Sequence, residues 1–201
     1  MKPIFNRLLI ATRNQGKFFE FQKVLTKYPV KVFPLQGLDV PEIEETGTTF
    51  LENAKIKAEF AAHFVDDETA VISDDSGICI DALGGAPGIY SSRYANGDFN
   101  YAMDKILGKL KTLDAKEKTA AFICELFLIL PNGKRYSFHG EAHGAIATSK
   151  RGTGFGYDPI FIPNGFDKTF GEMSNDEKNK ISHRGKALET FSNWMNRHFL
   201  S

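Results

Sequence analysis

The 201-residue sequence carries no excess of charge of either sign, because 25 Lys and Arg residues balance 25 Asp and Glu residues. A protein that follows a nucleic-acid backbone usually needs an excess of basic residues, so the sequence predicts no stable nucleic-acid partner. No uncharged apolar run approaches the roughly 18 residues of a membrane helix, and the N-terminal residues do not resemble a signal peptide. We therefore expect no membrane association, while the 42% of hydrophobic residues excludes a disordered chain.

Cysteine is scarce in the sequence. Cys79 and Cys124 stand singly in apolar stretches and do not form a C-x-x-C pair. This arrangement favours buried thiols over a disulfide or a zinc site, and a cytoplasmic location is expected. The sequence also has no repeat, low-complexity tract or linker, which predicts a single domain over residues 1–201.

Hydrophobic periodicity predicts an α/β fold with a mixed β-sheet. Short apolar strands and amphipathic helices alternate at both ends of the chain. Between them, residues 120–147 predict a long β-hairpin that reverses at Asn132-Gly133. A helix that begins after Thr48 or Thr49 should precede a four-residue strand at 70–73.

Polar, glycine-containing segments are expected at the ends of these elements, where α/β sheets bind ligands. They are residues 12–17 (TRNQGK), 73–77 (SDDSG), 152–159 (GTGFGYDP) and 177–188 (EKNKISHRGKAL). The first segment opens a helix beside Lys17 and can bind an anion, although it is not a P-loop. A polar turn with a solvated lysine is an equally good interpretation of that segment.

Adjacent acidic residues suggest a metal site. Asp74 and Asp75 are expected at the carboxyl end of strand 70–73, and Mg²⁺ bound between them and a phosphate would relieve their mutual repulsion. A solvent-facing turn is the alternative. Glu44 and Glu45, in the loop before the second helix, offer a further metal ligand, although acidic loops are usually only solvated.

The last two segments offer aromatic rings and cations. The glycines of residues 152–159 fail the Rossmann test, because a strand follows them instead of a helix. Phe155 and Tyr157 can stack on a nucleobase, or they can simply pack on the sheet. If Ser182 caps the final helix, His183 and Arg184 lie in its first turn, where positive charge is unfavourable because of the helix dipole. Residues that break a local preference in this way often belong to functional sites. Together these residue types suit a nucleoside triphosphate with Mg²⁺.

Five segments, taken in order, resemble the motifs of the inosine triphosphatase family of non-canonical purine nucleoside triphosphate pyrophosphatases. They are ATRNQGKFFE, EETGTTFLENAKIKA, SDDSGICIDALGGAPGIYSSRYA, GFGYDPIF and EKNKISHRGKAL. The resemblance covers essentially the whole chain and is closest to bacterial members. Arg13 stands where many relatives carry glycine and Gly171 where alanine is usual, and neither change is expected to remove a ligand contact.

The resemblance implies hydrolysis of ITP, dITP and XTP to the monophosphate and pyrophosphate, with Mg²⁺ as cofactor. It also implies a homodimer and an elongated mixed α/β fold of two lobes, with the active site in the cleft between them. Asp75 resembles the catalytic residue and a metal ligand, with Glu44 as the second metal ligand and Glu45 as the open alternative. The positions that resemble substrate contacts are Thr12, Arg13, Asn14, Gln15, Gly16, Lys17, Lys57, Ser76, Phe155, Gly156, Tyr157, Asp158, Lys178, His183 and Arg184.

Two other functions remain compatible with the sequence. One is a pyrophosphatase that acts on other modified nucleotides, such as modified pyrimidines. The other is a non-catalytic module that binds ITP as a sensor, although the adjacent Asp74 and Asp75 favour chemistry over sensing.

Overall fold

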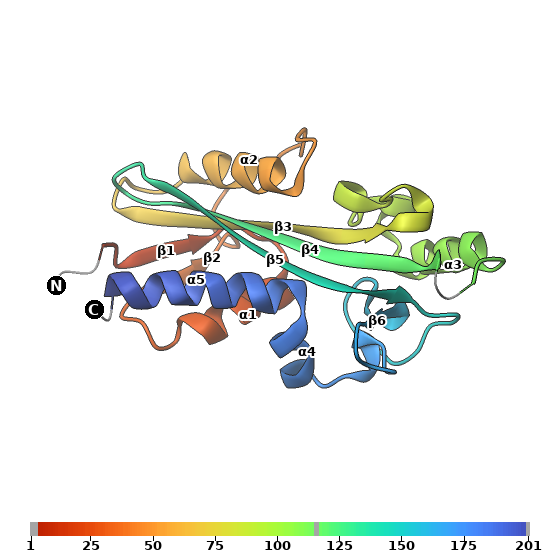
Figure 1. Ribbon diagram of the computed structural model, residues 1–201. Coiled ribbons are helices and arrows are strands. Elements are labelled where there is room, and N and C mark those ends of the chain that lie inside the picture. Colours follow the sequence, from red (N-terminus) through yellow and green to blue (C-terminus); the bar gives the residue numbers. More distant parts are fainter. Residues whose placement is uncertain (1–3, 115–116, 200–201) are drawn as a thin grey trace. The chain divides into compact units, whose positions relative to one another are not determined.

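A mixed six-stranded sheet with the strand order β2-β1-β3-β4-β5-β6 organises the chain (Figure 1). The computed structural model describes residues 4–114 and 117–199. The strands are β1 (Arg7–Ile10), β2 (Lys31–Pro34), β3 (Thr69–Ile80), β4 (Thr119–Ile129), β5 (Arg135–Ile146) and β6 (Phe161–Pro163). β1 pairs in parallel with β2 and β3, whereas β5 and β6 are antiparallel. The mixed α/β class predicted from the sequence is therefore confirmed; the cleft between two lobes stays a prediction.

The chain forms two compact units, each built from separate segments. The first unit contains the chain up to residue 75, residues 125–139 and the chain from residue 187. The second contains residues 76–124 and 140–186. The helices are α1 (Gln15–Leu25), α2 (Phe50–Ala62), α3 (Phe99–Leu110), α4 (Asn175–Ile181) and α5 (His183–Phe199). The single domain predicted over residues 1–201 stays a prediction.

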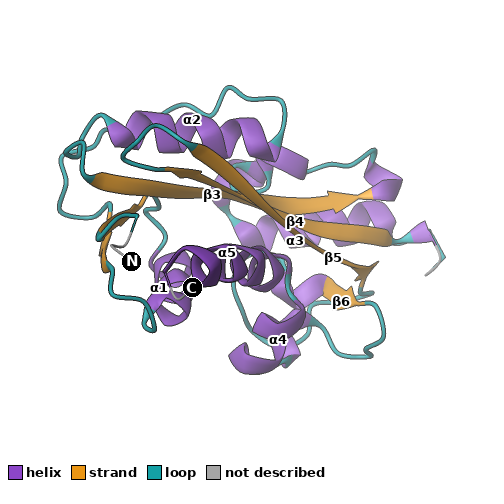
Figure 2. Cartoon of the chain, turned by 60° about the vertical axis from the view of Figure 1, so that its left-hand side comes forward, coloured by secondary structure: helices purple, strands orange, loops and turns teal. Residues whose placement is uncertain are grey.

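Helices cover both faces of the sheet in the first unit. α2 lies on one face, and α1 and the first-unit part of α5 lie on the other (Figure 2). Small residues on α2 allow it to lie close to the strands, because Ala54, Ala58 and Ala61 are buried together with Leu9 and Val71. The Ser73 hydroxyl donates a hydrogen bond to the Ala54 carbonyl at 2.5 Å, which ties α2 to β3.

Aromatic side chains fill the core of the second unit. Phe122, Phe161 and Phe170 contact one another and are almost completely buried. Aliphatic residues of β3 and α3, among them Ile78 and Ile106, complete this core. The high phenylalanine content of the sequence therefore serves packing in this unit.

β3 differs from the sequence prediction. Asp74 and Asp75 were expected just beyond a four-residue strand, but they lie inside a strand that runs from Thr69 to Ile80. The parallel register with β1 extends only to Ile72, whereas β3 continues beside its other neighbour, the 11-residue β4. The two aspartates thus lie just past the end of β1, not past the end of their own strand.

Other local predictions are confirmed. The β4–β5 hairpin reverses where Gly133 adopts φ +78°, a conformation that glycine tolerates. Thr49 is the N-cap of α2 and forms a capping box with Glu52. The short helix α4 was not predicted, because its polar sequence has no apolar stripe. Among the described residues, no helix is long and apolar enough to cross a membrane.

Replacement of the α2 cap should lower stability. Thr49→Ala removes the Oγ1 acceptor of the Glu52 N–H, so we expect the free energy of unfolding to fall by about 1 kcal/mol. Urea denaturation measures the change, with Thr46→Ala at an exposed position of the preceding loop as the matched control. Equal midpoints for the two variants would contradict a stabilising cap.

Candidate functional site

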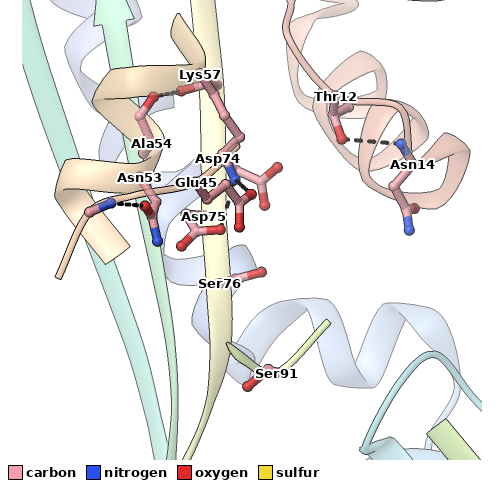
Figure 3. Close-up of polar contacts among 12 residues, drawn as sticks. Thr12, Asn14, Glu45, Asn53, Ala54, Lys57, Asp74, Asp75, Ser76 and Ser91 are labelled. Carbon is pink, nitrogen blue, oxygen red and sulfur yellow. Dashed lines mark hydrogen bonds and ion pairs between the residues drawn. The ribbon is translucent and has the colours of Figure 1, made fainter. Parts of the chain in front are cut away.

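Two buried carboxylates on β3 form the centre of a charged cluster in the first unit (Figure 3). The Lys17 ammonium, from α1, lies 2.7 Å from Oδ2 of Asp74, which is 2% exposed. The Lys57 ammonium, from α2, lies 2.7 Å from Oδ1 of Asp75, which is 6% exposed. Carboxylates buried to this degree are strongly disfavoured without a partner, and each helix supplies one cation. The structure thus brings together three residues that the sequence placed in one site: Lys17, Lys57 and Asp75.

Lys57 also contacts a third carboxylate. Its ammonium lies 3.0 Å from Oε1 of Glu45. Figure 3 shows Glu45 beside Lys57 and Asp75. Burial alone would lower the pKa of Lys57, but the negative charges of Asp75, Asp74 and Glu45 outweigh burial and raise this pKa above its usual value. Burial raises the pKa of Asp75, while the Lys57 ammonium opposes that shift. Lys57 is therefore charged and pairs with carboxylates from β3 and from the loop before α2.

The start of α1 lies next to this cluster, because Lys17 in its first turn pairs with Asp74. Asn14 is the N-cap, and its side chain accepts a hydrogen bond from the Lys17 N–H at 3.0 Å. The Thr12 hydroxyl accepts from the Asn14 N–H at 3.2 Å and fixes the approach to the helix. Gln15 and Gly16 are exposed in the first turn, where N–H groups have no acceptor within the helix. This geometry suits a phosphate.

The two glutamates of the acidic loop, residues 41–49, lie in different surroundings. Glu45 is partly buried and faces Lys57, whereas Glu44 is exposed. The guanidinium of Arg13 donates to the carbonyl oxygen of Val40, immediately before the loop. Arg13 therefore holds the start of the acidic loop in this structure.

The carboxylates of this cluster fit a magnesium ion. Oδ2 of Asp75 is buried, and no residue of the described chain forms a hydrogen bond with it. No group of three or more His, Cys, Asp or Glu side chains encloses a metal position within residues 4–114 and 117–199. Mg²⁺ is typically held by one or two carboxylates, with substrate phosphates and water completing its shell. Asp75 together with a neighbouring glutamate provides that number of protein ligands.

A second charged cluster lies in the second unit. Asp158 is 3% exposed and accepts hydrogen bonds from the Lys178 ammonium at 2.5 Å and from the Phe155 N–H at 2.9 Å. Burial raises the pKa of Asp158, and Lys178 opposes this shift. The Asp158 carboxylate thus joins the loop that carries Phe155 to α4, which carries Lys178.

The corner between α4 and α5 positions two further predicted residues. The ring of His183 stacks on Phe122, with ring centroids 4.6 Å apart and an interplanar angle of 8°. Arg184 is buried, and its Nη2 donates to the Ser76 hydroxyl at 2.9 Å. A Cβ atom at Gly185 would lie 1.8 Å from a backbone oxygen of α4, so only glycine permits this close approach.

Aromatic contacts support the loop around Gly156. Phe155 is 49% exposed, and its ring meets Phe99 edge-on at 5.6 Å between centroids. Tyr157 also meets Phe99 edge-on, and its hydroxyl donates to the carbonyl oxygen of Ser91 at 2.8 Å. Phe155 is therefore the ring left open for stacking on a ligand, whereas the buried Tyr157 anchors the loop.

Sequence reasoning missed several residues that build these clusters. Asn53 binds the acidic loop, Phe99 supports two rings, and Ser91 accepts from Tyr157. Asn53 lies four residues before Lys57 on α2, and this helical spacing was the available signal. Phe99 and Ser91 act through contacts distant in sequence, which periodicity does not reveal.

Comparison with known proteins gives consistent matches over most of the chain. Residues 8–194 match the model of the Ham1 family. A dITP/XTP pyrophosphatase of Geobacter sulfurreducens is 46% identical over 188 residues, which cover 90% of this chain and 92% of that protein. A dITP/XTP pyrophosphatase of Bacillus subtilis is 46% identical over 194 residues, 94% of this chain and 96% of that protein.

Solved structures show the same fold. A HAM1 protein from Coxiella burnetii superimposes with a TM-score of 0.87 at 40% identity, covering 95% of this chain and 98% of that one. The Ham1 protein of Staphylococcus aureus gives a TM-score of 0.85 at 37% identity, with the same coverage.

The buried hydroxyl of Tyr157 should produce a stability difference that depends on pH. Burial raises the pKa of Tyr157 above its ordinary value of 10.0, so its contribution to stability is complete below that value and is lost as pH rises toward the folded-state pKa. At neutral pH we expect Tyr157→Phe to lower the free energy of unfolding by about 1 kcal/mol, through loss of the hydrogen bond to Ser91. Denaturant unfolding should show this difference shrinking above about pH 10; a constant difference would contradict it.

Proposed function

Because the chain belongs to the Ham1 family, we propose that it hydrolyses non-canonical purine nucleoside triphosphates, such as ITP, dITP and XTP, to the monophosphate and pyrophosphate. The Ham1 family match and the similar dITP/XTP pyrophosphatases confirm the family that the five sequence segments indicated. Support from the structure comes from the lysine-paired carboxylates of β3, Asp74 and Asp75. Phosphoryl transfer depends on cations and carboxylates fixed around one polyanion.

The first-unit cluster is suited to the triphosphate. The N–H groups at the start of α1 and the ammonium groups of Lys17 and Lys57 can donate hydrogen bonds to phosphate oxygens. Asp75 and Glu45 would hold Mg²⁺, which when bound neutralises charge on the phosphates. We favour Glu45 over Glu44 as the metal ligand, because Glu45 is partly buried beside Lys57, whereas Glu44 is exposed to solvent.

Asp75 is the proposed catalytic residue. One carboxylate cannot be a tight metal ligand and a full-strength base at once. Burial nevertheless raises the pKa of Asp75, which favours proton uptake, and Lys57 keeps the carboxylate charged before the water attacks. The carboxylate can therefore orient the attacking water and accept its proton. The ammonium groups of the two lysines remain beside the leaving pyrophosphate, where negative charge increases during the reaction.

The second-unit cluster is suited to the purine base. Phe155 offers an exposed ring for stacking, and His183 and Arg184 offer hydrogen-bond donors. Hypoxanthine and xanthine carry an acceptor at C6, where adenine carries an amino donor. The donors of His183 and Arg184 therefore favour hypoxanthine and xanthine over adenine. A donor left unpaired in a buried site is costly, which disfavours ATP. Tyr157 and Asp158 hold the stacking loop in place.

The homodimer, the cytoplasmic location and the lack of a nucleic-acid partner remain predictions from the sequence. Sedimentation equilibrium would test the first of them.

The reaction is tested with ITP, XTP, dITP, GTP and ATP, each with and without Mg²⁺, scored for monophosphate and pyrophosphate. We expect Mg²⁺-dependent release of pyrophosphate from ITP, XTP and dITP. Asp75→Asn should lower kcat at saturating substrate and Mg²⁺ by about 100-fold or more, because it removes the proton acceptor. Asp67→Asn, at an exposed position, is the matched control. Nucleotide binding without pyrophosphate release would instead favour the sensing module, and near-normal turnover of Asp75→Asn would remove Asp75 from catalysis.

The choice between the two glutamates is tested by a matched pair of variants. Glu45→Gln should raise the Mg²⁺ concentration needed for half-maximal activity by about tenfold or more, because it removes a charged ligand. Glu44→Gln should leave that concentration close to the wild-type value. A larger effect of Glu44→Gln would restore the original sequence prediction of Glu44 as the metal ligand.

A further inference from the structure

Asn53 is a completely buried polar residue in the first unit that the reaction described above does not use. It lies on α2 with 0% exposure, one helical turn before Lys57 and therefore on the same face of the helix. Figure 3 shows its side chain close to the segment that carries Glu45. Burial of an amide costs free energy unless the amide forms hydrogen bonds.

One half of the Asn53 amide holds the acidic loop. Its Oδ1 accepts a hydrogen bond from the Gly47 N–H at 2.8 Å. A Cβ atom at Gly47 would lie 2.7 Å from this same oxygen and 2.7 Å from Cβ of Glu52. The loop therefore lies so close to α2 that a side chain at position 47 would clash. Position 47 thus has room only for glycine, and the hydrogen bond to Asn53 holds the Gly47 backbone in place.

The other half of the amide gains nothing from the described residues. Nδ2 of Asn53 is buried and forms no hydrogen bond with the described residues. An apolar side chain of similar volume would avoid this cost. The acceptor oxygen is therefore the feature that distinguishes asparagine from leucine at this position in the structure.

The Gly47 contact restrains the backbone next to Glu45, because only one residue separates Gly47 from Glu45. Glu45 reaches the Lys57 ammonium at 3.0 Å, and Arg13 holds the start of the same loop through the Val40 carbonyl. Asn53 holds Gly47, two residues after the glutamate. The loop is therefore fixed on both sides of Glu45.

We propose that Asn53 is a positioning residue that, through Gly47, holds the Glu45 carboxylate beside Asp75 for divalent-cation binding. This proposal rests on the proposed function, in which Asp75 and Glu45 form the metal-binding pair. Asn53 itself contacts neither the cation nor the substrate.

The test measures binding of Mn²⁺ alone to the full-length protein by electron paramagnetic resonance, without nucleotide or turnover. Asn53→Leu removes the acceptor, and we expect the Mn²⁺ affinity to fall about tenfold or more, as for other residues that orient metal ligands. Asn53→Asp keeps an acceptor oxygen for the Gly47 N–H and should retain Mn²⁺ binding. Gly47→Ala forces the loop away from Asn53 and should weaken binding as Asn53→Leu does.

Thr49→Ala is the matched structural control, because it loosens the start of α2 while leaving the Asn53 to Gly47 hydrogen bond intact. We expect it to lower the unfolding temperature and to leave Mn²⁺ affinity unchanged. If Asn53→Leu does not fold, as judged by circular dichroism, Gly47→Ala and Asn53→Asp still decide the question.

The inference is overturned if Asn53→Leu or Gly47→Ala binds Mn²⁺ as the wild type does, or if Thr49→Ala loses as much affinity as they do. Absence of Mn²⁺ binding to a wild-type protein that hydrolyses ITP would overturn it as well, while leaving the proposed function intact. Conversely, a wild type that binds Mn²⁺ but releases no pyrophosphate from any substrate would refute the proposed function alone.

Discussion

Two neighbouring carboxylates inside β3 need nearby cations, and this requirement shapes much of the first unit. Asp74 and Asp75 are almost completely buried, and adjacent buried negative charges are tolerated only with closely placed cations. The N-cap of α1 and the alanine-rich face of α2 bring Lys17 and Lys57 within 2.7 Å of them. The same residues that stabilise the fold therefore form the charged surroundings that phosphate chemistry needs.

Much of the fold follows from local signals in the sequence. Thr49 was recognisable as a cap, Asn132-Gly133 as a hairpin turn, and the alternating helices and strands as an α/β sheet. β3 was placed wrongly because acidic residues usually end a strand, and only its sheet neighbours show that it continues. α4 was missed because its stability comes from caps and tertiary contacts, which leave no apolar period.

The candidate site was predictable where residue type and chemistry coincide. Lys17 and Asp75 were predicted because each lies in a polar, glycine-containing segment at the end of a predicted element, where α/β sheets bind ligands, and the structure brings both into one charged cluster. The preference for Glu45 needed the position of Lys57, since adjacent glutamates are equivalent in a sequence. Asn53 and Phe99 support other residues through space, and no motif records such support.

The pairing of both lysines has a consequence for the selection of ligands in the cell. Inorganic phosphate must draw Lys17 and Lys57 away from carboxylates that already neutralise them, so it gains little net attraction. In the proposed function, Asp75 and Glu45 would hold a divalent cation that arrives with a triphosphate, and the ammonium groups of Lys17 and Lys57 would then pair with the phosphates in place of the carboxylates. In the ligand-free protein, the carboxylate partners of both lysines thus disfavour the binding of an anion that brings no cation with it.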